Sequence, residues 1–130
     1  MKWAATEAMS SEYDMRQMAR GTGKSVAFTA GSEVFKEGDA GTVMYVVQSG
    51  VVEMVLHDKV IEVVEPNGAI GYMSMIDGRA RSSTARVKEN CELTEIDARK
   101  FRFMVDEIPN FSQYIMQMLA GRIRGMGKAL

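Results

Sequence analysis

Hydrophobic positions occur in short runs through the middle of the chain, and glycine interrupts these runs every few residues. β-branched and aromatic residues dominate the runs from Ser25 to Ile96. Short, closely spaced runs with turn residues between them are typical of an all-β sandwich or barrel. Turn signatures at 57–59 and 66–68 follow two of the runs, and the first of them predicts a hairpin. Strands are predicted at 26–28, 33–35, 42–47, 51–56, 60–64, 84–87 and 91–96.

The N-terminal part has a different spacing. Residues 1–20 predict a weakly amphipathic helical segment, because Met15, Met18 and Ala19 fall on one side of a helix. Gly21 follows at once and predicts the end of this segment.

The last third of the chain again has helical spacing. Asp97 is the expected N-cap of a helix over 98–105, and Pro109 fits the first turn of a second helix. An apolar stripe of the second helix is predicted to form a core face or a dimer seam, and glycines 125 and 127 predict its end. The stripe consists of Phe111, Ile115, Met118, Leu119 and Ile123.

Length and composition limit the architecture to one domain. The chain has 130 residues, of which 46% are hydrophobic and 25% charged, values typical of a globular protein. We therefore expect one domain in three parts: an N-terminal helical segment at 1–24, a barrel at 25–97 and C-terminal helices at 98–130. A net charge of −1 gives no overall field for binding nucleic acid or an anionic membrane.

Cysteine and histidine occur once each, which excludes several kinds of site. Cys91 alone cannot form an intrachain disulfide or a cysteine-based zinc site, and His57 alone cannot supply a site that needs two imidazoles. The N-terminus has no apolar core of a signal peptide, and no run approaches the roughly 20 residues of a membrane span. We expect a cytoplasmic protein without a metal or cofactor.

The segment from Gly68 to Val87 carries the strongest sign of chemistry. A glycine turn precedes a short helical stretch at 72–76, whose first N–H groups would be free to bind an anion. Arginine and two serines follow at 81–83 and supply a guanidinium fork and hydroxyl groups. Residues 71–88 hold four cations against one carboxylate, a local charge of +3. This pattern fits a phosphate-binding site, but it also fits a solvated basic turn, and the residues alone leave both interpretations open.

Here the sequence resembles the cyclic nucleotide-binding domain of the catabolite activator protein and of the regulatory subunits of cyclic-AMP-dependent kinase. The resemblance covers roughly residues 25–124. It rests on the phosphate-binding cassette of that family, on the segments at 35–41, 44–47 and 49–52 before it, and on 106–111 after it. The cassette residues are Ile70-Gly71-Tyr72-Met73-Ser74-Met75 and Arg81-Ser82-Ser83-Thr84-Ala85.

The resemblance implies an eight-stranded antiparallel jelly-roll barrel, mainly β, with N-terminal and C-terminal α-helices. It also implies that Arg81 pairs with the cyclic phosphate and that Gly71 lets the backbone approach the ligand. Further phosphate contacts would come from Ser82 and from the N–H groups of Ser74 and Ser82. The predicted ligand-binding residues are Gly71, Tyr72, Met73, Ser74, Arg81, Ser82 and Ser83.

Two features depart from the family or extend it. Tyr72 stands where the family has a glutamate that accepts the ribose 2′-hydroxyl, and an ionised acceptor contributes about 1.5–3 kcal/mol. Loss of this acceptor corresponds to a roughly 10- to 150-fold weaker affinity.

The family mechanism implies that C-terminal helices close over the ligand, where Arg122 or Arg124 would cap the base by stacking.

Two hypotheses of function stay open. The first is a ligand-sensing regulatory module that binds cyclic AMP, cyclic GMP or a related anionic ligand. The second is a degenerate member that binds no nucleotide and serves as a protein-interaction or dimerisation module. A pocket filled by Tyr72, with Arg81 paired to Asp77 or Glu95, would favour the second hypothesis.

An enzyme is not expected. The sequence shows neither paired carboxylates nor an activated nucleophile, and one histidine cannot build the metal site of the enzymatic jelly rolls. If 130 residues is the natural length, we expect no DNA-binding domain of the transcription-factor type after the last helix; a fragment of a longer chain is the alternative. We therefore expect no direct nucleic-acid or membrane binding, and output through a protein partner or a homodimer.

Overall fold

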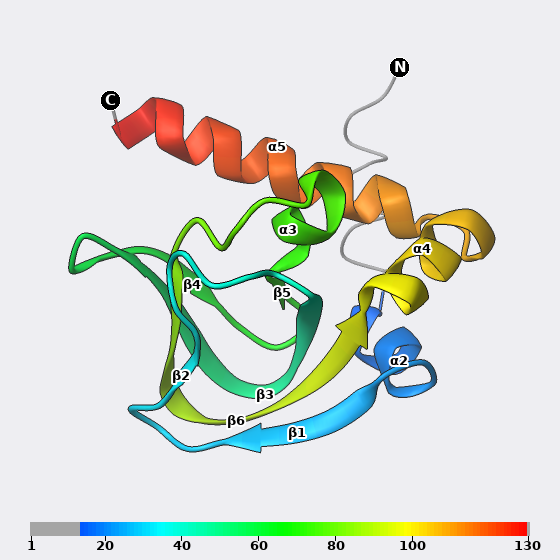
Figure 1. Cartoon of the computed structure of the whole chain (residues 1–130), viewed down its shortest axis with the longest axis horizontal. Coiled ribbons are helices and arrows are strands. Elements are labelled where there is room, and N and C mark those ends of the chain that lie inside the picture. The colour runs from blue at the N-terminus through cyan, green and yellow to red at the C-terminus, as the bar shows by residue number, and fades with distance from the viewer. Residues whose placement is uncertain (1–13, 130) are drawn as a thin grey trace. The chain divides into compact units, whose positions relative to one another are not determined.

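The computed structural model describes residues 14–129, with side chains up to residue 125 (Figure 1). The chain divides into two compact units, one over Met15–Phe101 and the other containing the residues from Arg102 onward. The part of the predicted N-terminal helical segment at residues 1–13 lies outside the described residues. The predicted boundaries at 24/25 and 97/98 stay predictions.

The first unit is built on an antiparallel sheet, which has six strands within the described residues. Strands β1, β6, β3 and β4 lie side by side in that order, while β2 pairs with β6 and β5 pairs with β3. Figure 1 shows the long strands β3 and β6 curving together around the interior. The strands are β1 (Lys24–Phe28), β2 (Glu33–Phe35), β3 (Val43–Leu56), β4 (Lys59–Val64), β5 (Ala69–Ile70) and β6 (Thr84–Asp97). A mainly antiparallel β fold with flanking helices is thereby confirmed.

The predicted strands are fewer and longer in the structure, because two pairs of them are continuous. The runs at 42–47 and 51–56 join in β3, and those at 84–87 and 91–96 join in β6. The pairing of β3 with β6 shifts register between Val47 and Val52, and Gly50 within this stretch has a φ of 85°. A positive φ lets the strand bend without ending. Divided at this irregularity, β3 and β6 bring the six strands to the eight that the resemblance implies, and the pattern had predicted all of these except β5.

The interior of this unit is apolar. Its core cluster takes inward-facing residues from β2, β3, β4, β5 and β6, in agreement with the alternation expected of a half-buried sheet. The cluster comprises Phe35, Tyr45, Val47, Val52, Met54, Val64, Ile70, Ala85, Val87, Cys91 and Leu93.

Two helices flank this sheet within the first unit. Helix α2 (Met15–Arg20) buries Met15 and Ala19, as its pattern predicts, and ends at Gly21. Gln48 of β3 connects this helix to the sheet, since its Nε2 donates to the Arg16 carbonyl at 3.0 Å and to the Thr94 hydroxyl at 2.9 Å. Helix α3 (Tyr72–Asp77) follows β5 and lies between two glycines of positive φ.

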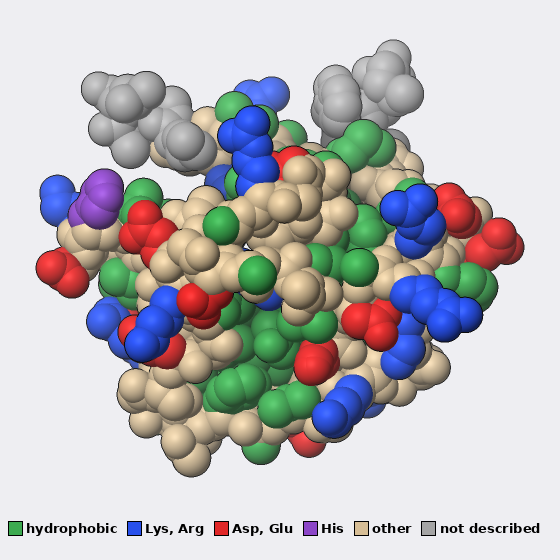
Figure 2. Space-filling view, in the orientation of Figure 1, with side chains coloured by type: hydrophobic (Ala, Val, Ile, Leu, Met, Phe, Trp, Pro, Cys, Tyr) green, Lys and Arg blue, Asp and Glu red, His purple; other side chains and the backbone are tan. Residues whose placement is uncertain are grey.

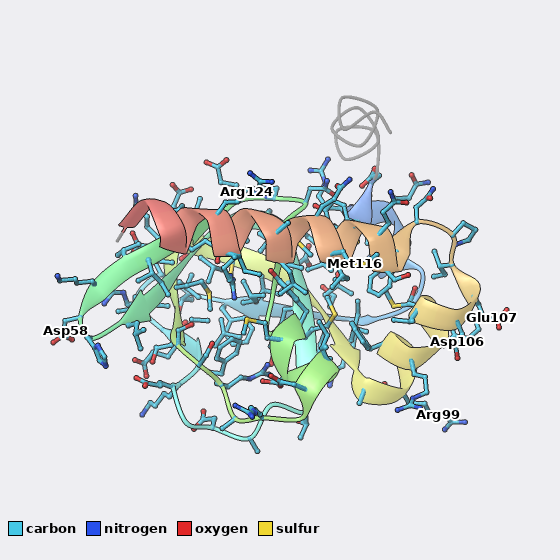
Figure 3. All side chains as sticks on the ribbon, turned by 90° about the horizontal axis from the view of Figure 1, so that it is seen from above. Asp58, Arg99, Asp106, Glu107, Met116 and Arg124 are labelled. Atoms are coloured by element: carbon cyan, nitrogen blue, oxygen red, sulfur yellow. The ribbon has the colours of Figure 1, made fainter. Side chains whose placement is uncertain are left out.

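The predicted turns are also present. His57 and Asp58 have φ values of 52° and 63° and join β3 to β4, which is the two-residue turn of a hairpin. Figure 3 shows Asp58 at the tip of this hairpin. At the second turn, the N–H of Gly68 donates to the Glu65 carbonyl at 2.9 Å.

The C-terminal helices are α4 (Ala98–Glu107) and α5 (Phe111–Ala129). Asp97 caps α4 as predicted, because its carboxylate accepts the N–H of Lys100 at 2.8 Å. The predicted end of α5 at glycines 125 and 127 is wrong, since the helix continues to Ala129. A glycine weakens a helix by only about 1 kcal/mol and does not by itself end one. Among the described residues, no helix has the length and apolar character needed to cross a membrane.

Candidate functional site

Arg81 lies between α3 and β6, and the loop before β3 holds its backbone on both sides. The N–H of Gly38 donates to the Arg81 carbonyl at 2.9 Å, and the Arg81 N–H donates to the Asp39 carbonyl at 2.9 Å. A third bond joins the same segments, because the Thr84 hydroxyl accepts the N–H of Glu37 at 3.0 Å. These bonds hold the backbone from which the Arg81 side chain extends, and the residue is only 5% exposed.

Backbone carbonyls and one aromatic ring surround the guanidinium group of Arg81. Its Nη1 donates to the Gly71 carbonyl at 2.8 Å, and its Nη2 donates to the Val43 carbonyl at 2.5 Å. The Cζ atom lies 4.1 Å from the centre of the Phe35 ring, which is a cation–π contact. The Nε atom is buried and has no hydrogen-bond partner among the residues that the structure describes. In the part of the chain that the structure describes, Arg81 has no ion pair with a carboxylate.

Burial lowers the pKa of Arg81, whereas nearby Tyr45 and Asp39 act in the opposite direction. Arginine nevertheless stays charged in proteins, so the site holds a buried cation. A buried charge is costly unless it is paired, and carbonyl groups and a ring face compensate it only in part. The site is therefore electropositive and has an unused N–H donor, a combination that suits an anionic ligand.

Two glycines give this guanidinium group its space. Gly71 has a φ of 78°, and a Cβ there would lie 2.6 Å from Nη1 of Arg81 and 3.3 Å from the Phe35 ring. Gly41 approaches from the other segment, and a Cβ there would lie 3.3 Å from the same nitrogen and overlap the side chain of Ser74. In the structure Gly71 thus accommodates Arg81. Its close approach to a ligand stays a prediction.

The start of α3 and the serines lie around the same arginine. The N-cap residue of α3 is Gly71, which makes no side-chain cap hydrogen bond because it has no side chain. Ser74, in the first turn, is 6% exposed, and Ser83 is 5% exposed. Ser82 is exposed, and Met73 is partly buried. The structure therefore brings together Gly71, Ser74 and Arg81 and turns Ser82 towards solvent.

Tyr72 is the first residue of α3 and is only 1% exposed. It does not belong to the core cluster that fills the sheet. Arg81 pairs with neither Asp77 nor Glu95: the Asp77 carboxylate accepts the N–H of Arg79 at 3.0 Å. Pairing of Arg81 with Asp77 or Glu95, which would favour an interaction module without nucleotide, is therefore absent. The burial of Tyr72, which favours the same module, is present.

A row of aromatic rings leads from Arg81 into the core. The ring of Phe35 stacks on Tyr45 with centres 6.5 Å apart, and Phe28 meets Tyr45 edge-on at 6.3 Å. Burial raises the pKa of Tyr45, nearby Glu95 raises it further, and Arg81 lowers it. The phenol is therefore neutral at physiological pH, which leaves Arg81 as the charged group at this end of the row.

The predicted base-capping residues Arg122 and Arg124 lie on α5, in the second compact unit. Arg124 is exposed and is labelled on this helix in Figure 3. Capping of a base by either arginine stays a prediction.

The face seen in Figure 2 carries charges of both signs around its edge, with hydrophobic side chains gathered near its centre over β3 and β6. No extended patch of one sign is visible on this face. The positive character of the site is therefore local and arises from the buried Arg81.

Three residues that contact Arg81 were not predicted from the sequence. Phe35, Gly41 and Val43 lie about 40 residues before it, in or beside strands that the sequence identified only for their apolar pattern. Gly41 acts through the absence of a side chain and Val43 through its backbone carbonyl, and residue type alone indicates neither role. The segment at 35–41 resembles the family and could have pointed to Phe35 and Gly41, but no role was assigned to it.

Comparison with known proteins gives a family match over most of the chain. The family model described as the cyclic nucleotide-binding domain matches residues 25–107. The chain is 29% identical over 89 residues to a cGMP-dependent protein kinase of Eimeria tenella, which covers 66% of this chain and 9% of the kinase. It is 26% identical over 102 residues to the cyclic AMP receptor protein of Thermus thermophilus, which covers 75% of this chain and 47% of that protein.

Solved structures show the same fold. The catabolite activator protein of Thermus thermophilus has a TM-score of 0.76 and 24% identity, over 87% of this chain and 55% of that one. The regulatory subunit of a cAMP-independent protein kinase A from Trypanosoma brucei has a TM-score of 0.64 and 18% identity, over 72% and 35% of the two chains. The chain spans less than half the length of the curated relatives described above.

Proposed function

We propose that this chain, which belongs to the cyclic nucleotide-binding domain family, is a ligand-sensing regulatory module that binds cyclic AMP or cyclic GMP at Arg81. The observation that carries the proposal is the buried guanidinium group, which has a free Nε donor and no ion-paired carboxylate among the described residues. A cyclic phosphate at this point would neutralise the buried charge and accept the Nε–H, while both carbonyl hydrogen bonds could persist. The names of the relatives, which mention both nucleotides, support this ligand class.

The surrounding residues take complementary roles in this proposal. Arg81 holds the phosphate, and the side chain of Ser82 and the N–H groups of Ser74 and Ser82 complete its contacts, with Ser83 beside them. Gly71 provides space, and Tyr72 and Met73 lie where the sugar would bind. Ligand binding favours a closed state in which Arg122 or Arg124 covers the base, so the difference in contacts between two states makes the module a switch. It performs no catalysis itself, and it acts in the cytoplasm through a protein partner or homodimer.

The second candidate function is an interaction module without a nucleotide. It is favoured by Tyr72, which is neutral and buried where the family has glutamate. It is also favoured by large apolar side chains of α4 and α5 that are more than half exposed: Phe103 at 53%, Met116 at 59% and Ile123 at 66%. Met116 is labelled in Figure 3. The Trypanosoma structure, named as part of a cAMP-independent kinase, has the same fold.

Calorimetric titration with cyclic AMP, cyclic GMP and 5′-AMP tests the proposal. We expect micromolar or tighter binding of a cyclic form, none of 5′-AMP, and loss of binding in Arg81→Ala. Arg79→Ala is the matched control, because Arg79 is exposed and its side chain takes no part in the site. The absence of binding up to millimolar ligand, or full binding by Arg81→Ala, would overturn the proposal and favour the interaction module.

A further inference from the structure

The loop that holds Arg81 has a shape fixed by its own bonds. In the segment Lys36–Thr42, the N–H of Asp39 donates to the Lys36 carbonyl at 3.0 Å, and Gly38 has a φ of 90°. The Asp39 carboxylate accepts the N–H of Lys36 at 2.9 Å and closes the turn. Together with its three bonds to Arg81 and Thr84, this makes the loop a rigid frame beside the arginine.

Gly41 lies in this frame at the point where the loop meets α3. A Cβ at Gly41 would overlap both the Cβ and the Oγ of Ser74 and would lie 3.3 Å from Nη1 of Arg81. The φ of Gly41 is not in the positive region, so its backbone is open to any residue and only space requires glycine. Because Ser74 Cβ is fixed to the α3 backbone, relief of this overlap has to move α3 and the loop apart.

We propose that Gly41 is a positioning residue of the anion site: its missing side chain sets the distance between the start of α3 and Arg81. This inference rests on the proposed function and adds a residue of the loop to it. One anion can meet the Ser74 N–H and the guanidinium group of Arg81 only if these two donors lie close together. A side chain at position 41 drives them apart, so the anion keeps one set of donors and loses the other.

The test compares Gly41→Ala with Ser74→Gly and with the double variant. Ser74→Gly keeps the backbone N–H but removes both overlapping atoms. We expect Gly41→Ala to weaken cyclic nucleotide binding about tenfold or more, the loss that follows when one charged hydrogen bond fails. In the double variant, binding returns to the level of Ser74→Gly alone. Gly121→Ala is the control, because a Cβ at Gly121 meets nothing within 4 Å.

A second measurement does not depend on the ligand. The Nε–H of Arg81 is buried, so its signal in a ¹H–¹⁵N spectrum can be assigned by its absence in Arg81→Lys. We expect this signal to shift in Gly41→Ala, to return in the double variant and to stay unchanged in Gly121→Ala. If the parent protein binds no cyclic nucleotide, the proposed function fails, and the signal still decides the role of Gly41.

Two results would overturn the positioning role. One is an unshifted Nε–H signal in Gly41→Ala with parental affinity. The other is a double variant that stays as impaired as Gly41→Ala, since the effect then does not pass through Ser74. If Gly41→Ala fails to fold, the double variant alone is compared with Ser74→Gly, and unequal affinities would reject the role.

Discussion

At the scale of single residues, the protein buries a cation at a position where burial of an apolar side chain would cost less free energy. Arg81 is 5% exposed, and its guanidinium group contacts two carbonyl groups and a ring but forms no ion pair with a carboxylate among the described residues. Replacing buried charges by apolar side chains is often neutral or stabilising for a fold. A buried, incompletely paired arginine is therefore better explained by what it binds than by what it contributes to stability.

Tyr72 is the residue whose replacement distinguishes the two candidate functions. In Tyr72→Glu, we expect cyclic nucleotide affinity to rise roughly 10- to 150-fold, because a carboxylate accepts the ribose hydroxyl more strongly than a phenol. Without ligand the variant should be less stable, since the new charge occupies a position that is 1% exposed. Calorimetry and thermal unfolding with and without ligand measure both effects.

Tyr72→Gln is the matched control for this prediction. Its side chain has nearly the same shape but no charge, so it should gain little affinity. A variant Tyr72→Glu that binds no better than the parent protein would contradict the expected role of an ionised acceptor at this position.

At the scale of elements, the sequence predicts where the strands lie but not which of them are continuous. The runs in β3 and β6 were identified correctly, but glycine at 50 was interpreted as a break between two strands. The structure shows that β3 bends at Gly50, where a Cβ would overlap the Asn90 carbonyl and lie 2.6 Å from Cys91 Cβ. Only the neighbouring strand reveals this crowding, so local sequence cannot distinguish a bend from an end.

Gly50→Ala should therefore destabilise the fold more than Gly31→Ala does. Both glycines have positive φ, at 85° and 92°, and each substitution costs about 1–2 kcal/mol for that reason. A Cβ at Gly31 meets nothing within 4 Å, whereas the crowding at Gly50 adds about 1–3 kcal/mol. Urea unfolding of the two variants measures the difference, and equal losses would show that β3 relaxes around the added methyl group.

The candidate site was predictable only as far as it is local. Gly71, Ser74 and Arg81 fall within one segment of 11 residues, and the Arg-Ser-Ser cluster with its positive local charge identified it. Phe35, Gly41 and Val43 come near Arg81 only because β2 pairs with β6 and the following loop bonds to the arginine backbone. Their roles depend on tertiary pairing, which neither periodicity nor composition contains.

At the scale of the whole molecule, burial sets the direction in which stability changes with pH. Burial raises the pKa of the Cys91 thiol, and burial followed by Glu95 raises that of Tyr45. A group whose pKa is higher in the folded state contributes stability that is present at low pH and lost as pH rises past its unfolded value. Those values are about 8.5 for cysteine and 10 for tyrosine. We therefore expect the free energy of unfolding to fall progressively above about pH 8.5.

Two variants separate these contributions. Cys91→Ala should remove the first part of the decline, and Tyr45→Phe a share of the part that begins near pH 10, to which Tyr114 also contributes because burial raises its pKa. Burial lowers the pKa of Arg81, a shift of the opposite sign, but arginine stays charged in proteins, so we expect no contribution from it to the profile. Urea unfolding between pH 7 and 11 measures the three profiles. If Cys91→Ala shows a decline parallel to that of the parent protein, the alkaline sensitivity does not come from this thiol, and exposed groups or the unfolded state must account for it.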